Sequence, residues 1–264
     1  MKKRAATELA RRVTAGDGVS IALTHYDAGS RRLILLAPGF WRVRADRENV
    51  FVAAHLARLG YDVAAFDFRG HGESGGRYTF GREEWKDVLA VARAFPGHDE
   101  LAAVGFSMGA SIAADAIVRA PELPFRALVM VSAPSDFARL RPRPWKPAAW
   151  RMMGLRRAFS APKVDWTAVP RSKPTAEKAV ETLAIPKLIV TLEDDWLVRP
   201  AHGRRLARAA APPVEHVHLP VRGSLHADAV VRHAPLSFLR ALDPFLKAWF
   251  PAPDPVAQSV AGVP

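Results

Sequence analysis

The chain alternates strand-like apolar runs with helical patterns, and this alternation is the feature that most restricts its fold. Apolar runs with no polar alternation lie at residues 31–40, 101–107, 125–135 and 186–195. Such runs are typical of strands that are buried on both faces, and strands that alternate with helices are typical of βαβ units on a mostly parallel sheet. The sequence therefore predicts an α/β domain.

Turn and helix signals place further elements along the chain. The pair Asp17-Gly18 predicts a tight turn, and hence a hairpin near the start. Helical spacing of apolar residues predicts a helix over 49–60, and Thr79 is predicted to open a second helix over 79–95. The last helix is expected over 235–250.

The composition is that of a globular protein with one large core. Of 264 residues, 49% are hydrophobic and 24% are charged, which excludes a disordered chain. Because there is no cysteine, disulfides, thiolate metal sites and cysteine nucleophiles are excluded. The basic N-terminus lacks the apolar stretch of a secretory signal, and no apolar run approaches the roughly 18 residues of a membrane span. We therefore expect a cytoplasmic protein.

The segment from Ser135 to Thr182 breaks the alternation. It contains several prolines, three tryptophans and no strand-like run, which predicts a lid inserted between two strands. The predicted organisation is a core of residues 1–134 and 183–264 with a lid of residues 135–182. The lid carries eleven Lys and Arg against four Asp and Glu, which is +7 of the net charge of +12.

The basic lid has two readings. It is either an ordinary solvated surface or a surface that recruits anionic or lipid-like acyl substrates and contacts a membrane surface. A nucleic-acid reader would carry an aromatic and basic stacking platform or a known motif. The sequence contains neither, so no nucleic-acid partner is expected.

Ser107 lies in Gly-Phe-Ser-Met-Gly, where a buried strand gives way to an Ala-rich helix. This pattern is typical of a nucleophile elbow, in which a tight turn exposes the serine and the glycines let strand and helix approach. An ordinary tight turn between a strand and a helix can have the same pattern. Whether Ser107 is a nucleophile therefore depends on whether the other groups that acyl transfer needs are also present. A base, an acid that orients it and two oxyanion donors are required.

An acid and a histidine follow Ser107 in the order that this chemistry uses on α/β sheets. Asp195 comes after the strand-like run 186–195, and His226 comes after the run 214–223. Strand ends at one edge of a parallel sheet converge, so both can meet Ser107. The backbone N–H groups of Phe40 and Met108 are the candidate oxyanion donors.

Together these motifs resemble the α/β-hydrolase superfamily, and within it the lysophospholipase, monoglyceride lipase and serine-aminopeptidase-like group. The matching stretches, within residues 18–250, are LILLAPGF, GYDVAAFDFRGHGESGG, VGFSMGA, LEDDWLVRP and GSLHAD. The resemblance implies a mostly parallel eight-stranded sheet flanked by helices, with a helical lid after the sixth strand. It also implies a catalytic triad of Ser107, Asp195 and His226.

The chain departs from this group at two places. Pro38-Gly39 stands where the group commonly has His-Gly, so a side chain that usually braces the oxyanion loop is missing. Leu192 stands where the acid loop usually begins with glycine. Asp194 is the second candidate for the acid, and Asp136 is a rarer alternative.

Several other polar residues have plainer readings. His216 and His218 alternate with apolar residues and are predicted to be strand residues, and His233 falls too far along the next helical stretch. His71 and Glu73 are expected to have a structural role in their turn. No HExxH or comparable ligand spacing is present, so no metal site is expected.

The sequence thus predicts an esterase-like or lysophospholipase-like serine hydrolase that cleaves a carboxylic ester or thioester through an acyl-enzyme on Ser107, with no metal or organic cofactor. Trp41, Trp196 and Leu197 are expected to contact the substrate. Two alternatives stay open. One is a peptidase or amidase with the same triad, and the other is a non-catalytic binding protein with this fold.

Overall fold

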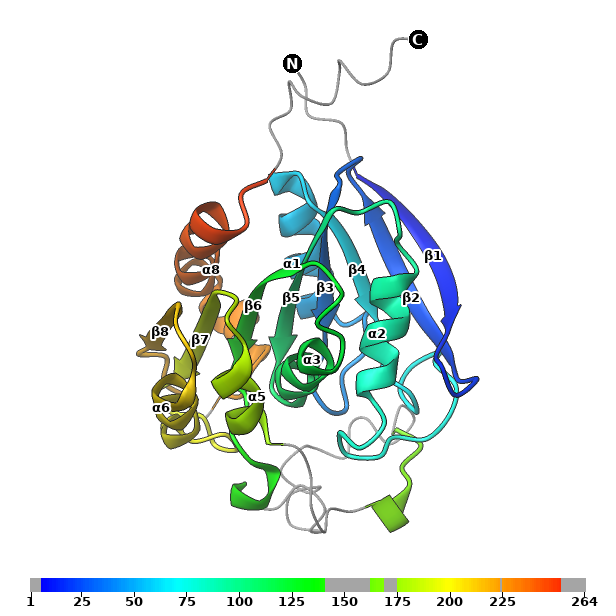
Figure 1. Cartoon of the computed structure of the whole chain (residues 1–264). Coiled ribbons are helices and arrows are strands. Elements are labelled where there is room, and N and C mark those ends of the chain that lie inside the picture. Colours follow the sequence, from blue (N-terminus) through cyan, green and yellow to red (C-terminus); the bar gives the residue numbers. More distant parts are fainter. Residues whose placement is uncertain (1–5, 141–161, 169–174, 224, 253–264) are drawn as a thin grey trace.

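The computed structural model describes residues 6–140, 162–168, 175–223 and 225–252, and an eight-stranded sheet forms its centre (Figure 1). The strand order is β1-β2-β4-β3-β5-β6-β7-β8. β1 and β2 pair antiparallel and β2 joins β4 antiparallel, whereas the strands from β3 to β8 run parallel. The strands are β1 (Thr7–Thr14), β2 (Ser20–Asp27), β3 (Arg32–Ala37), β4 (Asp62–Phe66), β5 (Glu100–Phe106), β6 (Phe125–Val131), β7 (Lys187–Leu192) and β8 (Val214–Leu219).

Helices cover both faces of the sheet. One face packs against α2 (Trp85–Arg93), α3 (Met108–Arg119), α5 (Ala176–Thr182) and α6 (Pro200–Ala209). The other packs against α1 (Arg47–Leu59), α7 (Ala229–His233) and α8 (Pro235–Trp249). The mostly parallel, helix-flanked sheet and the hairpin at Asp17-Gly18 are confirmed.

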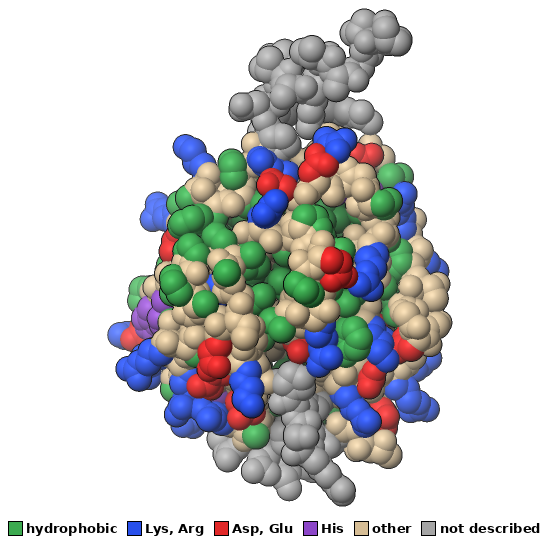
Figure 2. Space-filling view, in the orientation of Figure 1, with side chains coloured by type: hydrophobic (Ala, Val, Ile, Leu, Met, Phe, Trp, Pro, Cys, Tyr) green, Lys and Arg blue, Asp and Glu red, His purple; other side chains and the backbone are tan. Residues whose placement is uncertain are grey.

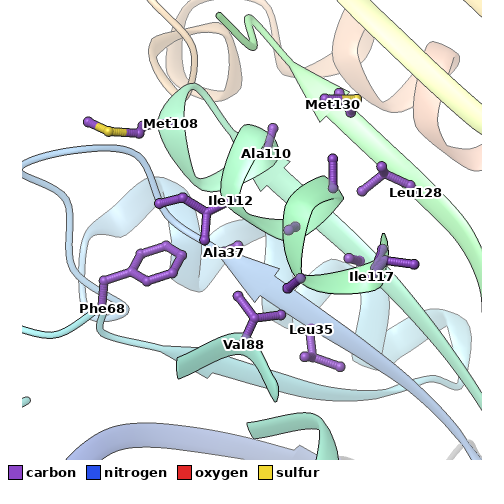
Figure 3. Close-up of a cluster of buried hydrophobic side chains, with 14 of the residues drawn as sticks. Leu35, Ala37, Phe68, Val88, Met108, Ala110, Ile112, Ile117, Leu128 and Met130 are labelled. Atoms are coloured by element: carbon purple, nitrogen blue, oxygen red, sulfur yellow. The ribbon is translucent and has the colours of Figure 1, made fainter. Parts of the chain in front are cut away.

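The core beneath α3 fixes the position of the functional site. Ile112 of α3 lies beside Ala37 of β3 and Phe68, and Ile117 of α3, Leu128 of β6 and Val88 of α2 belong to the same cluster (Figure 3). These side chains are almost fully excluded from solvent. Since burial of each such side chain contributes about 1.5–3 kcal/mol, α3 is held firmly against the strand that precedes it.

The helix predicted over 79–95 begins later than expected, and Thr79 does not open it. α2 starts at Trp85, and residues 79–84 form a turn in which Phe80 and Gly81 have positive φ of 56° and 87°. The Glu84 carboxylate accepts hydrogen bonds from the backbone N–H groups of Thr79 (2.5 Å) and Gly81 (2.6 Å). This buried carboxylate thus satisfies backbone donors outside the helix, and the turn replaces the predicted first turns.

Parts of the predicted lid are described, and the rest lies outside the described residues. The described parts contain two short 3-10 helices, η1 (Phe137–Arg139) and η3 (Trp166–Ala168), and then α5. α5 packs against α3 and α6, on the same face of the sheet. Residues 141–161 and 169–174 are not described, so the lid over 135–182 stays a prediction. In the described part of the chain, no helix is long and apolar enough to cross a membrane.

Candidate active site

Ser107 occupies a strained turn between β5 and α3. Its φ of 51° and ψ of −122° lie outside the regions that side-chain-bearing residues ordinarily adopt. The Ser107 N–H donates to the carbonyl of Val131 at 2.7 Å, which ties the turn to the neighbouring strand β6. The turn requires glycine at two positions for steric reasons. A Cβ on Gly105 would lie 2.4 Å from Ala110 Cα, and a Cβ on Gly109 would lie 2.2 Å from the Pro38 carbonyl oxygen.

The structure brings Ser107, His226 and Asp195 into one hydrogen-bonded chain. His226 Nε2 lies 2.8 Å from Ser107 Oγ, and His226 Nδ1 lies 2.9 Å from both carboxylate oxygens of Asp195. Backbone N–H groups of Leu197 and Val198 donate to Asp195 Oδ1 at 2.9 and 2.7 Å. The Asp195 carboxylate is buried, and these hydrogen bonds orient it toward the His226 imidazole. The imidazole is in turn oriented toward the Ser107 hydroxyl.

The other candidate acids lie elsewhere. Asp194 Oδ2 accepts a hydrogen bond from the Gly223 N–H at 3.4 Å. The Asp136 side chain accepts from the Ala138 N–H at 2.8 Å and so caps η1. Neither is hydrogen-bonded to His226 in the described structure.

The remaining histidines also have structural neighbours. His216 lies in β8, where its Nε2 is 2.8 Å from Thr191 Oγ1, and the exposed His218 lies in the same strand. His233 ends α7 and lines the rim of the cavity described below.

The turn with His71 supports the loop that carries Phe40. His71 Nδ1–H donates to the Arg69 carbonyl at 3.2 Å, and His71 Nε2 accepts from the Trp41 N–H at 3.1 Å. Burial lowers the pKa of His71 to about 4, so the ring stays neutral and keeps its acceptor. His71 therefore holds the loop that lacks the usual brace at Pro38.

The two candidate oxyanion donors belong to different elements next to Ser107. Phe40 follows β3, Met108 is the first residue of α3, and both line the same cavity as Ser107. Among the described residues, neither backbone N–H donates to a protein acceptor. The helix start at Met108 favours negative charge nearby. Both groups are thus available to an oxyanion formed next to Ser107.

A cavity of about 410 Å³ opens at Ser107, and its lining is of mixed character. The apolar lining residues include Phe40, Phe137, Leu140, Leu197 and Leu225. The charged or polar lining residues include Arg42, Asp228, Arg232 and His233. The predicted substrate contacts Trp41, Trp196 and Leu197 all line this cavity.

An ion pair in the cavity lining joins the loop of Phe40 to the loop of His226. Arg42 Nη2, from the loop after β3, lies 2.6 Å from Asp228 Oδ2, in the loop of His226. Burial raises the pKa of Asp228, and the Arg42 and His226 charges oppose that rise. Both loops contain a residue with positive φ, Trp41 at 67° and Ala227 at 46°. The pair therefore holds two strained loops together.

Two contacts near the site were not predicted, the hydrogen bond from the Trp41 N–H to His71 and the ion pair of Arg42 with Asp228. Asp228 lies two residues after His226, which is a weak signal for a role near the site. Arg42 gave no signal, because its partner lies 186 positions away in the chain.

One comparison with known proteins identifies the family of this chain. A sequence model of the family described as serine aminopeptidase, S33, matches residues 28–172, which is more than half of the chain. No match is found among curated protein sequences.

Solved structures with the same fold include several esterases. The Pyrococcus furiosus esterase Pf2001 is 22% identical, with a TM-score of 0.75 over 92% of this chain and 93% of that chain. The Rhodococcus sp. ECU1013 esterase RhEst1 is 19% identical, with a TM-score of 0.69 over 91% and 99%. The α/β hydrolase GrgF of Penicillium sp. sh18 is 17% identical, with a TM-score of 0.76 over 92% and 99%. At these identities the likeness shows the α/β-hydrolase fold.

Proposed function

The chain belongs to the serine aminopeptidase family of hydrolases, and from that premise we propose that it cleaves a small carboxylic ester or thioester through an acyl-enzyme on Ser107. The observation that carries this proposal is the chain of hydrogen bonds from Asp195 through His226 to Ser107. A hydroxyl within 2.8 Å of an imidazole that a carboxylate orients is the arrangement that activates a serine.

The proposed mechanism assigns a role to each of these groups. Ser107 Oγ attacks the acyl carbon while His226 Nε2 takes its proton, and Asp195 stabilises the imidazolium and holds the proton on Nδ1. The backbone N–H groups of Phe40 and Met108 donate to the carbonyl oxygen as it becomes an oxyanion. His226 then protonates the leaving alcohol or thiol. Water, activated by the same imidazole, attacks the acyl carbon, releases the acid and restores Ser107.

The cavity supports a small substrate with one apolar and one polar part. A volume of about 410 Å³ lies in the lower range of ligand pockets, which span about 300–1,000 Å³. The apolar lining residues, which include Phe137 and Leu140, suit a short acyl chain. The polar lining residues, which include the ion pair of Arg42 and Asp228, suit a polar leaving group.

A probe and a substrate panel test the proposal. Purified wild type and Ser107→Ala are treated with a fluorophosphonate, and hydrolysis of p-nitrophenyl esters of increasing acyl length is measured. We expect labelling of wild type alone, a loss of kcat of about 10⁴-fold or more in the variant, and a preference for short acyl chains. Equal labelling of both proteins contradicts the mechanism. A binding protein without catalysis would leave all esters intact.

The family description favours a second candidate, an aminopeptidase or amidase that uses the same groups. Its chemistry differs in the leaving group, an amine that His226 must protonate. Aminoacyl p-nitroanilides belong in the same panel for this reason. Faster turnover of these amides than of acyl esters would favour the second candidate over the first.

The basic segment 135–182 adds a finer hypothesis, contact with anionic or lipid-like substrates at a membrane surface. On the face seen in Figure 2, Lys and Arg side chains are spread among Asp and Glu rather than gathered in one patch. Sedimentation with anionic vesicles, compared with neutral vesicles, tests whether this segment binds a charged surface. A cytoplasmic location is part of the same hypothesis.

A further inference from the structure

Three side chains that are far apart in the sequence converge at the end of the sheet opposite Ser107. His25 lies in β2, Asp62 begins β4, and His98 lies in the loop before β5. His25 Nε2 and His98 Nε2 lie 2.9 and 3.0 Å from the same atom, Asp62 Oδ2. One ligand atom from each of the three residues lies within 4.8 Å of the others.

The cluster is buried and its parts are oriented. The side chains of His25, Asp62 and His98 are 8%, 4% and 11% exposed. Asp62 Oδ1 accepts hydrogen bonds from the backbone N–H groups of Ala28 and Ser30 at 3.0 and 2.9 Å, which fixes the carboxylate. Its other oxygen, Oδ2, therefore faces the two imidazoles.

An aromatic ring holds both imidazoles in place. Phe95 packs edge-on against His25 and His98, with ring centroids 4.8 and 5.5 Å apart. This contact limits the rotation of each ring about its side-chain bonds, so both Nε2 atoms keep their direction toward Asp62.

Without a metal, each ring carries its proton on Nε2, because the Asp62 carboxylate that Nε2 faces can only accept a hydrogen bond. The buried Nδ1 atoms of His25 and His98 have no hydrogen-bond partner among the described residues. When a cation takes the place of the Nε2 hydrogen, no described group that binds Nδ1 prevents the ring proton from moving there. Each ring can therefore carry its proton on Nδ1 and present the Nε2 lone pair to a cation.

Two imidazole nitrogens and one carboxylate oxygen form a ligand set that suits Zn²⁺, with a fourth position for water. Neighbouring ligand atoms of a tetrahedral zinc, each about 2.1 Å from the metal, lie about 3.4 Å apart. The observed separations of 2.9 and 3.0 Å between each Nε2 and Asp62 Oδ2 need to open by about 0.5 Å. The two Nε2 atoms, which lie within 4.8 Å of each other, need to reach a separation of about 3.4 Å.

We propose that His25, Asp62 and His98 bind one Zn²⁺ ion as a structural site. The ion would join β2, β4 and the loop before β5, at the end of the sheet opposite Ser107. It stabilises the fold and takes no part in the reaction at Ser107. The spacing of these residues gave no sign of a ligand motif, because three separate elements supply them.

Zinc binding to the full chain tests this site. The purified protein is dialysed against EDTA, and Zn²⁺ is added in isothermal titration calorimetry and thermal unfolding. We expect one ion per chain and a rise in Tm of about 5 °C when free Zn²⁺ is 100-fold above Kd. Co²⁺ in place of Zn²⁺ should give the visible absorption of a tetrahedral site. Ester hydrolysis with and without Zn²⁺ should be equal.

Matched variants locate the ion. His98→Gln lies in a loop and should abolish binding, the Tm rise and the Co²⁺ spectrum, with circular dichroism as the check on folding. His55→Gln is the control, because His55 forms a similar pair with Asp243 at 2.9 Å that belongs to no three-residue group in the described part of the chain. The proposal is overturned if wild type binds no Zn²⁺, or if His98→Gln binds it as wild type does.

Discussion

Replacement of Gly109 by alanine is expected to disable the oxyanion site while the protein stays folded. The added Cβ would lie 2.2 Å from the Pro38 carbonyl oxygen and 2.5 Å from that of Ala37. Since ordinary van der Waals contacts lie at about 3.5 Å, the loop after β3 or the start of α3 must move by about 1 Å. That loop carries Phe40, and α3 begins at Met108, so the move separates the two proposed donors.

The expected losses of kcat and of unfolding free energy in Gly109→Ala are estimated separately. A displacement of about 1 Å at a catalytic group costs about 100-fold in rate. Overpacking costs about 1–3 kcal/mol of unfolding free energy, and the better helix propensity of alanine returns up to about 1 kcal/mol. We therefore expect Gly109→Ala to lower kcat about 100-fold and the unfolding free energy by about 1–2 kcal/mol.

The assay compares kcat on a p-nitrophenyl ester with urea unfolding of the same preparation. Gly97→Ala is the control, because a Cβ there meets nothing within 4 Å, and it should leave both quantities unchanged. If Gly109→Ala keeps kcat within about threefold of wild type, the contact with Pro38 does not position the oxyanion donors. The reasoning would then be refuted.

Three further changes address other groups. Asp195→Asn should lower kcat about 10⁴-fold with little loss of stability, since an amide oxygen still accepts the two backbone hydrogen bonds but no longer stabilises the imidazolium. His71 has a pKa of about 4 in the folded protein. Unfolded His titrates near 6.5, so the stability that His71 contributes above that pH falls by about 3 kcal/mol as the pH drops to 4, and His71→Gln should flatten this slope in urea titrations. Arg42→Met should cost about 3–5 kcal/mol, because it leaves the buried Asp228 carboxylate unpaired, and should also lower kcat.

For each of these three substitutions, one result would contradict the expectation. Wild-type kcat in Asp195→Asn would assign the acid to another residue, with Asp194→Asn as the matched variant. An unchanged pH slope in His71→Gln would assign the slope to other buried histidines. For Arg42→Met, a second change of Asp228→Asn should recover part of the lost stability, and no recovery would mean that the ion pair is not the source of the loss.

The fold and the three central residues of the site could be predicted because local signals carry them. The buried runs are continuous, and the turn at Ser107 needs glycine at two neighbouring positions for steric reasons. The acid and the histidine follow strands that end at the same edge of the sheet, so Asp195 and His226 are placed by topology. Asp195 was preferred to Asp194 through family resemblance, and the structure puts Asp195 next to His226.

The rest depends on contacts between side chains that no local pattern encodes. The start of α2 was predicted wrongly because Glu84 accepts backbone hydrogen bonds that the periodicity assigns to a helix. The bond from Trp41 to His71 spans 30 positions, and its acceptor depends on a buried, neutral ring. Burial and tautomer are properties of the folded chain, so these roles become visible only in three dimensions.

The wide separation of the hydrogen-bonded groups has a consequence for a chain during synthesis. His226 lies 119 positions after Ser107, and Asp195 follows β7, the strand that pairs with β6. A nascent chain that ends before residue 226 holds the serine but no base to accept its proton. In the proposed mechanism, Ser107 is therefore inactive in any chain that lacks His226. Hydrolytic activity would then report on the assembly of β7 and β8 beside β6, because the loops of Asp195 and His226 follow these two strands.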